Sequence, residues 1–544
     1  FCGLMVALTA TKTAPTEKEN TKTANALKAA YWPQRAKWLA LAFLPSAFLV
    51  AVTTHISTDI SSGPFVWAPP LIAYIASFII VFGSKGDKAL RFATAALPVV
   101  TVCLLVTLTK PSDTLGMLFV TGLNIAVLFA GAIVCHGAMA ASRPSTDRLT
   151  EFYLIMSLGG VLGGAFCALT APILFDTIIE HPILLILLLL ARPVKSYHFG
   201  KKEFTILGVS LAVLIAIFTA TKVPSFRENI PFVLVYSLLL IPAALLILQR
   251  HHLFMPLLLA AILSITIPVF SQNNASTLAV ERGFFGVVKI TEQDGYRFMI
   301  HGNTIHGSQS LSEDTEKPTS TLYYHENSPI GQVFTAWRHK KRIGAVGLGA
   351  GTVACNMGSD QEITFFEIDP LVVKFATNPD YFNFLSACAP NAPIILGDGR
   401  LTLQQKPEGY FDVLLLDAFS SDAVPAHLLT REAVRSYFTR VSENGVIMLH
   451  ISNRHVDLGP ILGRIAEAEG LVLRRQQYQP KTIGDEPNFT SGTPSDVVVM
   501  ARNDDDLAPI LQDERWSEVT FTPGRPWTDD YTNIIGAMME KRSQ

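Results

Sequence analysis

The chain has 544 residues, more than the roughly 100–200 of a usual single domain, so at least two domains are expected. Only 16% of its residues are charged, against about 25% in an average soluble protein. The formal net charge of −2 gives no argument for a nucleic-acid partner, and none is expected.

Apolar segments dominate the first half of the chain. Residues 1–36 are expected to be an apolar helix end, without the features of a signal peptide, and a polar Lys-rich linker. Residues 37–270 contain apolar runs near the roughly 20 residues that cross a bilayer, which predicts a multi-pass α-helical membrane domain. The runs lie at about 37–54, 65–83, 92–109, 117–139, 151–172, 173–192, 205–221, 231–248 and 253–270. The count is eight or nine, because 173–192 also contains ionisable residues and a proline.

Small and ionisable residues interrupt these apolar segments. Overlapping GxxxG patterns predict close helix packing, and they are formed by Gly159, Gly160, Gly163 and Gly164. Ionisable residues near one membrane face are either solvated among lipid headgroups or mark a site. These residues are His55, Asp59, Asp176, Glu180 and His181.

The six cysteines form neither a CxxC pair nor a metal-ligand spacing, and no metal is expected. Cys103, Cys135 and Cys167 lie in apolar segments, where a buried thiol is usual. We therefore expect reduced, structural cysteines rather than a disulfide framework.

Beyond residue 270 the composition becomes that of a soluble protein. Residues 271–330 have strand patterns at 284–290 and 297–300, which predict a small β-sheet. Residues 331–544 alternate strands with helical stretches, which predicts a Rossmann-like α/β domain with a mostly parallel sheet. The expected strands are 343–347, 363–367, 394–396, 413–417, 445–451, 471–474 and 496–500.

The first two of these strands end in residues suited to a nucleoside. Gly347, Gly349 and Gly351 precede a predicted helix and allow close approach of the backbone to a ligand. The same motif also fits dinucleotide binding. Glu367, which lies 16 residues past Gly351, can accept two hydrogen bonds from a ribose diol. Asp369, just before a proline, is instead expected to cap a helix.

Acids also follow the third and fourth strands. Asp398, beside Gly399, can accept a hydrogen bond from an adenine amino group, or it can be an ordinary turn acid. Asp417 is expected to face the crevice where open α/β sheets bind ligands. With Asp422 it could bind and deprotonate an amine nucleophile. The alternative is an Asp-rich turn that caps the next helix.

Further motifs lie along both halves of the chain. They are Leu44-Pro45-Ser46, Thr53-Thr54-His55-Ile56-Ser57-Thr58-Asp59-Ile60, Thr150-Glu151-Phe152-Tyr153, His301-Gly302-Asn303-Thr304-Ile305-His306-Gly307, Tyr324-His325-Glu326, His450-Ile451-Ser452-Asn453-Arg454 and Trp527-Thr528-Asp529-Asp530-Tyr531. Together with the strand-end acids, they resemble the spermidine synthase family, the polyamine aminopropyltransferases. The resemblance is closer to a bacterial group that fuses such a domain to a membrane domain, and it covers most of the chain.

This resemblance implies a fold of the S-adenosylmethionine-dependent methyltransferase type. It also implies transfer of an aminopropyl group from decarboxylated S-adenosylmethionine to a polyamine, without a metal. Glu367 would bind the ribose, Asp398 the adenine, and Asp417 would help to deprotonate the attacking amine. Tyr324 and His325 match a Tyr-His-Glu stretch that lines the family's active site.

Three features depart from the family pattern. Ala350 stands where the family's glycine loop has an aspartate that binds the donor's amine. The family's Leu-Asp-Gly stretch is Ile300-His301-Gly302 here, and its nearby glutamine has no clear counterpart. Asp417 and Asp422 are separated by four residues instead of two. These departures bear on substrate choice, and they favour intact S-adenosylmethionine, another acceptor, or loss of catalysis.

Three functions stay open at this point. The first is a membrane-anchored aminopropyltransferase-like enzyme, and the second is a methyltransferase that uses intact S-adenosylmethionine. The third is a transporter or structural membrane subunit with a catalytically altered domain. The expected partners are an amine or polyamine substrate and the lipid bilayer, with a homo-oligomer or a membrane complex left open.

Basic loops predict the orientation in the membrane. The linker and the loops around 85–91, 143–148 and 192–202 are basic, and the positive-inside rule places them in the cytoplasm. Eight spans would put the C-terminal domain inside, whereas nine would put it outside. Because the implied donor is cytosolic, we predict a bacterial inner-membrane protein whose C-terminal domain is cytoplasmic.

Overall fold

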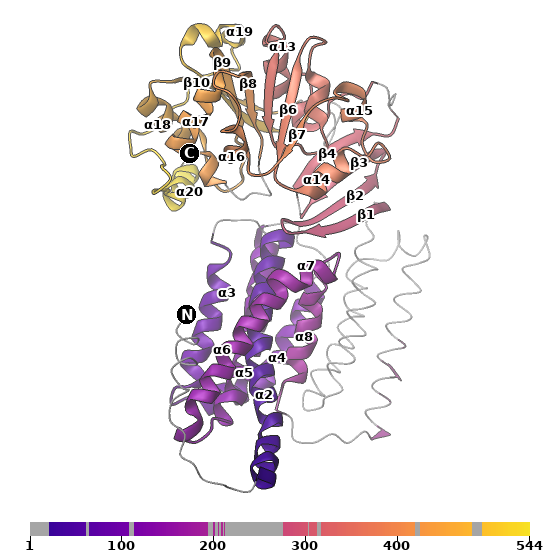
Figure 1. Cartoon of the computed structure of the whole chain (residues 1–544), viewed down its shortest axis with the longest axis vertical. Coiled ribbons are helices and arrows are strands. Elements are labelled where there is room, and N and C mark those ends of the chain that lie inside the picture. The colour runs from indigo at the N-terminus through magenta and orange to yellow at the C-terminus, as the bar shows by residue number, and fades with distance from the viewer. Residues whose placement is uncertain are drawn as a thin grey trace. The chain divides into compact units, whose positions relative to one another are not determined.

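The computed structural model divides the chain into two compact units, shown in Figure 1. Unit 1 comprises residues 1–60 and 65–273, and unit 2 comprises residues 61–64 and 274–544. The structure describes residues 21–60, 65–107, 114–193, 200–201, 205, 208–209, 212, 276–302, 304–312, 317–418, 425–480 and 492–543. Each unit is described by itself.

Unit 1 is helical throughout its described part. Its elements are α2 (Thr21–His55), a π-helical turn (Ile56–Ile60), α3 (Ala68–Val81), α4 (Gly86–Thr107), α5 (Thr114–Ala141), α6 (Leu149–Ala165), a second π-helical turn (Phe166–Thr170), α7 (Ala171–Leu174) and α8 (Glu180–Leu190). Among the described residues, three stretches are long and apolar enough to cross a membrane, and they are Trp32–Thr58, Met117–Ala141 and Thr146–Leu174. The spans expected at 205–221, 231–248 and 253–270 lie outside the described residues, so eight or nine spans stays a prediction.

Helix α6 packs closely against α2 through its small residues. A Cβ atom at Gly159 would lie 2.6 Å from the Leu39 carbonyl oxygen, and one at Gly163 would lie 2.3 Å from that of Phe43. Gly160 and Gly164 have open space around their Cα atoms. The predicted close packing is therefore confirmed for two of the four glycines.

Only some of the ionisable residues expected near one membrane face lie close together. The rings of His55 and His181 lie 4.6 Å apart, and His181 Nε2 is 3.1 Å from Asn124 Oδ1. Glu180, the first residue of α8, is also buried. Asp176, by contrast, is exposed, and the side chain of Asp59 is outside the described part.

Unit 2 begins with a four-stranded antiparallel sheet in the order β1-β2-β3-β4. Its strands are β1 (Ser276–Gly283), β2 (Gly286–Gln293), β3 (Tyr296–His301) and β4 (Thr304–Ser310). The two predicted strands correspond to β2 and β3, while β1 and β4 were not predicted. Strand β4 matters most for the site, because it lies against the glycine loop described below.

The main sheet of unit 2 has seven strands in the order β10-β11-β9-β8-β5-β6-β7. They are β5 (Arg342–Val346), β6 (Glu362–Glu367), β7 (Ile394–Leu396), β8 (Phe411–Leu416), β9 (Val441–His450), β10 (Val472–Tyr478) and β11 (Ser495–Ala501). Strand β11 runs opposite to the other six strands, so the sheet is mixed. All seven predicted strands are present, and the arrangement is the predicted Rossmann-like, methyltransferase-type fold.

Both faces of this sheet are buried. Along β8, Val413 and Leu415 enter one apolar core, while Leu414 and Leu416 enter the other. Because neighbouring strand residues point to opposite faces, both faces need covering elements. These include α13 (Pro329–Ala336), α14 (Pro370–Ala376), α15 (Phe384–Cys388), α16 (Gly399–Leu403), α17 (Arg431–Arg440), α18 (Gly459–Glu469), α19 (Ala508–Leu511) and α20 (Ile534–Ser543).

The prediction of reduced cysteines is wrong for one pair. Cys355 and Cys388 form a disulfide across a sequence separation of 33 residues. Cys355 lies in a 3-10 helix (Thr352–Asn356) and Cys388 ends α15, and these two elements pack together. Sequence spacing could not reveal the pair, because the packing of distant elements creates it. Cys103, Cys135 and Cys167 are not disulfide-bonded.

Removing this disulfide should destabilise unit 2. Closing a loop of this length corresponds to about 3–4 kcal/mol in the chain-entropy model. We expect a Cys355→Ser/Cys388→Ser variant to unfold at a lower temperature than the wild type, measured on the full chain in detergent. A reductant should lower the wild-type Tm toward that of the variant and leave the variant unchanged. An equal Tm for both proteins without reductant would contradict the pairing.

Candidate functional site

The glycine loop after β5 can exist only with glycine at its key positions. Gly347, Gly349 and Gly351 have φ angles of +98°, +55° and +84°, a region that favours glycine. A Cβ atom at Gly347 would lie 2.0 Å from the Asp417 carbonyl oxygen, and one at Gly349 would lie 2.4 Å from that of His306. The loop leads into a five-residue 3-10 helix rather than the α-helix that the motif predicts.

Glu367 ties this loop to the end of β6. Its Oε2 accepts the Leu348 N–H at 2.9 Å, and its Oε1 accepts those of Ile368 and Asp369 at 2.7 and 2.9 Å. Burial raises the pKa of Glu367, and these backbone donors oppose the rise. Asp369 accepts from Leu371 N–H at the start of α14, which confirms the predicted cap. A carboxylate has about four lone-pair sites and three of them accept backbone N–H groups here, so Glu367 keeps room for about one further hydrogen bond, from a ribose hydroxyl.

Replacing Glu367 by Gln should weaken both the loop and ligand binding. An amide nitrogen cannot accept an N–H, so at least one buried backbone donor loses its partner, at a cost of about 1–3 kcal/mol. We expect affinity for S-adenosylmethionine-type nucleosides to fall about tenfold or more in calorimetry. Glu362→Gln, at the exposed start of the same strand, is the matched control and should bind like the wild type. Unchanged binding in Glu367→Gln would remove this residue from the site.

Asp398 has a structural role in addition to its expected one. Its Oδ1 accepts the Leu401 N–H at 2.9 Å as the N-cap of α16, and its Oδ2 lies 3.3 Å from His427 Nε2. Gly399 follows, and a Cβ atom there would lie 2.3 Å from Val346 Cγ1 at the end of β5. The acid therefore stands at the carboxyl edge of the sheet, and its adenine contact stays a prediction.

Asp417 is the centre of the arrangement. It follows β8, and its side chain is 5% exposed. The Tyr324 hydroxyl donates to its Oδ2, and His450 Nδ1 lies 2.8 Å from its Oδ1. Burial raises the pKa of Asp417, but His450, Tyr324 and His306 together lower it by more, so the carboxyl is ionised at neutral pH. Its expected partner, Asp422, lies outside the described residues.

Four further residues of this site were not predicted as site residues. They are Tyr323, His306, His450 and Ser452. The Tyr323 ring stacks on that of His450 with 4.4 Å between centroids. Burial raises the pKa values of Tyr323 and Tyr324 well above normal, so both hydroxyls keep their protons. The His-x-Ser pattern at a strand end was the available signal, because alternate residues share one face.

Two histidines of the expected motifs have different surroundings. Burial lowers the pKa of His306 to about 4, so its ring is neutral, and its buried Nε2 has no partner within the described part of the chain. The predicted substrate residue His325 is half-buried, and its Nδ1 accepts the Asn327 N–H at 3.2 Å. No contact among the described residues joins His325 to Asp417, so its role stays a prediction.

Ala350 is covered by the small sheet. It is 1% exposed, and its N–H donates to the His306 carbonyl oxygen at 3.3 Å. A Cβ atom at Gly307 on β4 would lie 2.4 Å from the Cβ of Ala350. Strand β4 therefore occupies the space into which a larger side chain at position 350 would extend.

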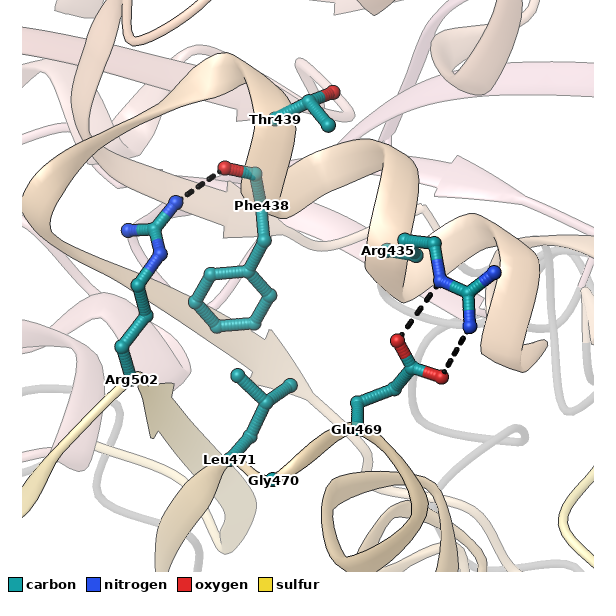
Figure 2. A pocket seen from close by; sticks show the side chains of 7 residues that line it. All are labelled: Arg435, Phe438, Thr439, Glu469, Gly470, Leu471 and Arg502. Atoms are coloured by element: carbon teal, nitrogen blue, oxygen red, sulfur yellow. Dashed lines mark hydrogen bonds and ion pairs between the residues drawn. The ribbon is translucent and has the colours of Figure 1, made fainter.

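Figure 2 shows a separate hollow of about 430 Å³. It is lined by Arg435, Phe438, Thr439, Glu469, Gly470, Leu471 and Arg502. These residues lie near the amino ends of β9 and β10, whereas Asp417 follows the carboxyl end of β8. Arg435 pairs with Glu469 at 2.8 Å, and Arg502 donates to the Phe438 carbonyl oxygen at 2.6 Å. The hollow is thus distinct from the glycine-loop site, and its charged groups bind one another or the backbone.

Comparisons with known proteins find partial matches to two transferases. No family model matches the chain. A polyamine aminopropyltransferase of Vibrio vulnificus is 25% identical over 199 residues, which are 35% of this chain and 64% of that protein. An N-terminal histidine N-methyltransferase of Emericella nidulans is 25% identical over 264 residues, 44% of this chain and 43% of that protein. The chain thus spans less than two thirds of either relative.

Solved structures that match part of the chain include spermidine synthases and methyltransferases. The spermidine synthase of Thermotoga maritima is 14% identical with a TM-score of 0.32, and the match covers 45% of this chain and 81% of that one. A methyltransferase of Archaeoglobus fulgidus is 14% identical with a TM-score of 0.24, covering 32% and 91%. Within the described residues no group of three or more His, Cys, Asp or Glu side chains is placed to hold a metal.

Proposed function

We propose that this protein is a membrane-anchored transferase that moves an aminopropyl group from decarboxylated S-adenosylmethionine to an amine acceptor. One observation carries the proposal. The ionised carboxylate of Asp417 follows β8 at the carboxyl edge of the sheet, and its own backbone touches Gly347 of the glycine loop. A nucleoside on that loop would bring its reactive carbon close to this carboxylate.

The reaction needs orientation and a proton acceptor. The lone pair of a neutral amine forms a bond to the carbon beside the sulfonium, and the carbon–sulfur bond breaks with its electron pair passing to sulfur. The nitrogen becomes positively charged and releases a proton. Asp417 stabilises that charge and accepts the proton, while Glu367 and Asp398 hold the ribose and the adenine.

Product analysis tests the proposal directly. The purified full chain, labelled decarboxylated donor and putrescine or longer amines should give a labelled polyamine and an equal amount of 5′-methylthioadenosine. Release of neither product with any amine, in a protein that binds the donor by calorimetry, would overturn it.

A second candidate, methyl transfer from intact S-adenosylmethionine, is favoured by the surroundings of Ala350. With that position buried against Gly307, the site lacks the acid that would select the decarboxylated donor's amine. The Emericella relative is itself named an N-terminal histidine N-methyltransferase. Tighter binding of intact donor, with S-adenosylhomocysteine as product, would select this candidate over aminopropyl transfer.

Membrane insertion is part of the proposal and rests on the three long apolar helices of unit 1. The Cys355–Cys388 disulfide opposes the predicted cytoplasmic placement of unit 2, because disulfides persist mainly in oxidising compartments. Alkylation of intact cells with a membrane-impermeant maleimide, before and after reduction, decides between the two sides. Labelling of Cys355 only after cell lysis supports the cytoplasm, while labelling after reduction of intact cells supports the outside.

A further inference from the structure

A continuous series of hydrogen bonds leads from Asp417 to strand β11. Asp417 Oδ1 lies 2.8 Å from His450 Nδ1, and His450 Nε2 lies 2.8 Å from Ser452 Oγ. The Ser452 oxygen in turn accepts the backbone N–H of Asp496 at 2.9 Å. His450 is 8% exposed, so solvent does not compete strongly for its two nitrogens.

For a neutral His450 imidazole, hydrogen-bond chemistry gives the direction of this series. An ionised carboxylate carries no proton, so the contact to Asp417 requires the proton on His450 Nδ1. Ser452 accepts a bond from an amide that can only donate, and its own hydroxyl proton is free to point at His450 Nε2. The imidazole is then held at both nitrogens in one tautomer, with a donor directed at Asp417.

The far end of the series is anchored in β11 and its neighbours. The Asp496 carbonyl oxygen accepts the Ile451 N–H at 2.8 Å, so both backbone groups of Asp496 hold the end of β9. The Asp496 carboxylate binds Arg475 through two contacts of 2.8 and 2.5 Å, and Arg475 also pairs with Asp457 at 2.9 Å. Tyr323 covers the His450 ring from one side. The imidazole therefore has little freedom to turn.

We propose that His450 is a positioning residue for Asp417, and that Ser452 and the Asp496 amide hold His450 in the tautomer that donates to that carboxylate. The inference rests on the proposed transferase function and assigns roles that the strand-end acids alone do not give. Tyr324 fixes one oxygen of Asp417 and His450 fixes the other, so the carboxylate plane is set on both sides. A carboxylate held in this way presents its remaining lone pairs to the attacking amine in one orientation.

Paired substitutions at two positions test the proposal. His450→Ala removes the donor, whereas His450→Asn can place an amide N–H near the position of Nδ1. Ser452→Ala removes the second link, and Ser452→Thr keeps a hydroxyl. His339→Asn, at an exposed histidine far from these contacts in sequence, is the control. We expect kcat to fall about 100-fold in His450→Ala and severalfold in Ser452→Ala, with donor affinity unchanged. The Asn and Thr variants should recover much of the lost rate.

The pH profile separates positioning from general damage to the fold. The groups facing Asp417 are Tyr323, Tyr324, His306 and His450. Burial raises the pKa of Asp417, and His450, Tyr324 and His306 lower it by more. Transfer requires the ionised form, so the rate rises as pH increases through this pKa. Loss of His450 should therefore move the acidic limb of kcat to higher pH, whereas a merely unstable variant loses rate without that shift.

Two outcomes would overturn the inference. One is a His450→Ala enzyme with kcat within twofold of the wild type, and the other is a loss of rate with an unmoved acidic limb and no recovery in His450→Asn. If the wild type forms no product with any amine, the proposed function is rejected. The contact between Asp417 and His450 is then tested by thermal stability instead of by activity. The Tm shifts of Asp417→Asn, His450→Ala and the double variant should then be clearly non-additive, and additive shifts would reject the contact.

Discussion

Asp417→Asn should reduce kcat by about 10²–10⁴-fold while leaving donor binding close to that of the wild type. The amide keeps the shape of the side chain, but it carries no charge and is a poor proton acceptor. It also cannot accept hydrogen bonds at both positions that now face Tyr324 and His450. Single-turnover transfer and calorimetry on the same protein separate the loss of chemistry from any loss of binding.

Asp412→Asn is the matched control for this variant. Asp412 lies on the same strand, and its carboxylate accepts the N–H groups of Lys341 and Arg342 at 3.2 and 3.0 Å. These bonds lie at the opposite end of β8 from Asp417, so this variant should lose stability and keep kcat within about twofold. If both variants lost kcat equally, the effect of Asp417→Asn would be a fold effect, and Asp417 would not be the proton acceptor.

The main sheet was predictable because strands and ligand-facing turns have local signatures. Most of its strands contain a short apolar run, and residues such as Glu367 and Asp417 mark where a run ends. Since parallel strands share one carboxyl edge, acids at successive strand ends must gather there once the order of strands is fixed. Asp369 was also predictable, because a helix cap depends only on the residues next to it.

Contacts between distant segments could not be predicted in this way. Tyr324 and His450 meet at Asp417 from 93 and 33 residues away, so local sequence can mark each residue as a candidate but cannot show that they meet. The Cys355–Cys388 bond has the same origin. Asp398 shows a different limit of sequence analysis, because the same residue is a helix cap and a candidate ligand contact. The local sequence is compatible with both roles and does not distinguish between them.

The electrostatics of the site follow from burial as much as from residue identity. Burial keeps Tyr323 and Tyr324 protonated and His306 neutral. Burial raises the pKa of Asp417, but electrostatic attraction to His450 and the hydrogen bonds from His450 and Tyr324 lower it by more, so the carboxyl stays ionised. A buried anion attracts a cationic or amine-bearing ligand, and this supports an amine acceptor without specifying which amine.

Gly347→Ala should disable both the fold of the glycine loop and nucleoside binding. The φ angle of +98° is costly for alanine, and the new Cβ would lie 2.0 Å from the Asp417 carbonyl oxygen, a backbone atom that cannot move aside. We expect a loss of about 3 kcal/mol or more in unfolding free energy and no measurable donor binding in calorimetry. Moving this carbonyl would also displace Asp417 itself, so one methyl group perturbs the loop and the carboxylate together.

Gly470→Ala isolates the contribution of backbone strain. Gly470 has a φ angle of +67°, but a Cβ atom there would meet nothing within 4 Å. Alanine at this position should cost only about 1 kcal/mol and leave donor binding intact. The difference between the two variants in thermal unfolding then measures the collision at Gly347. If Gly347→Ala and Gly470→Ala were equally destabilised and both still bound the donor, the glycine loop would be able to move away from Asp417. The proposal that the nucleoside lies close to the Asp417 carboxylate would then be rejected.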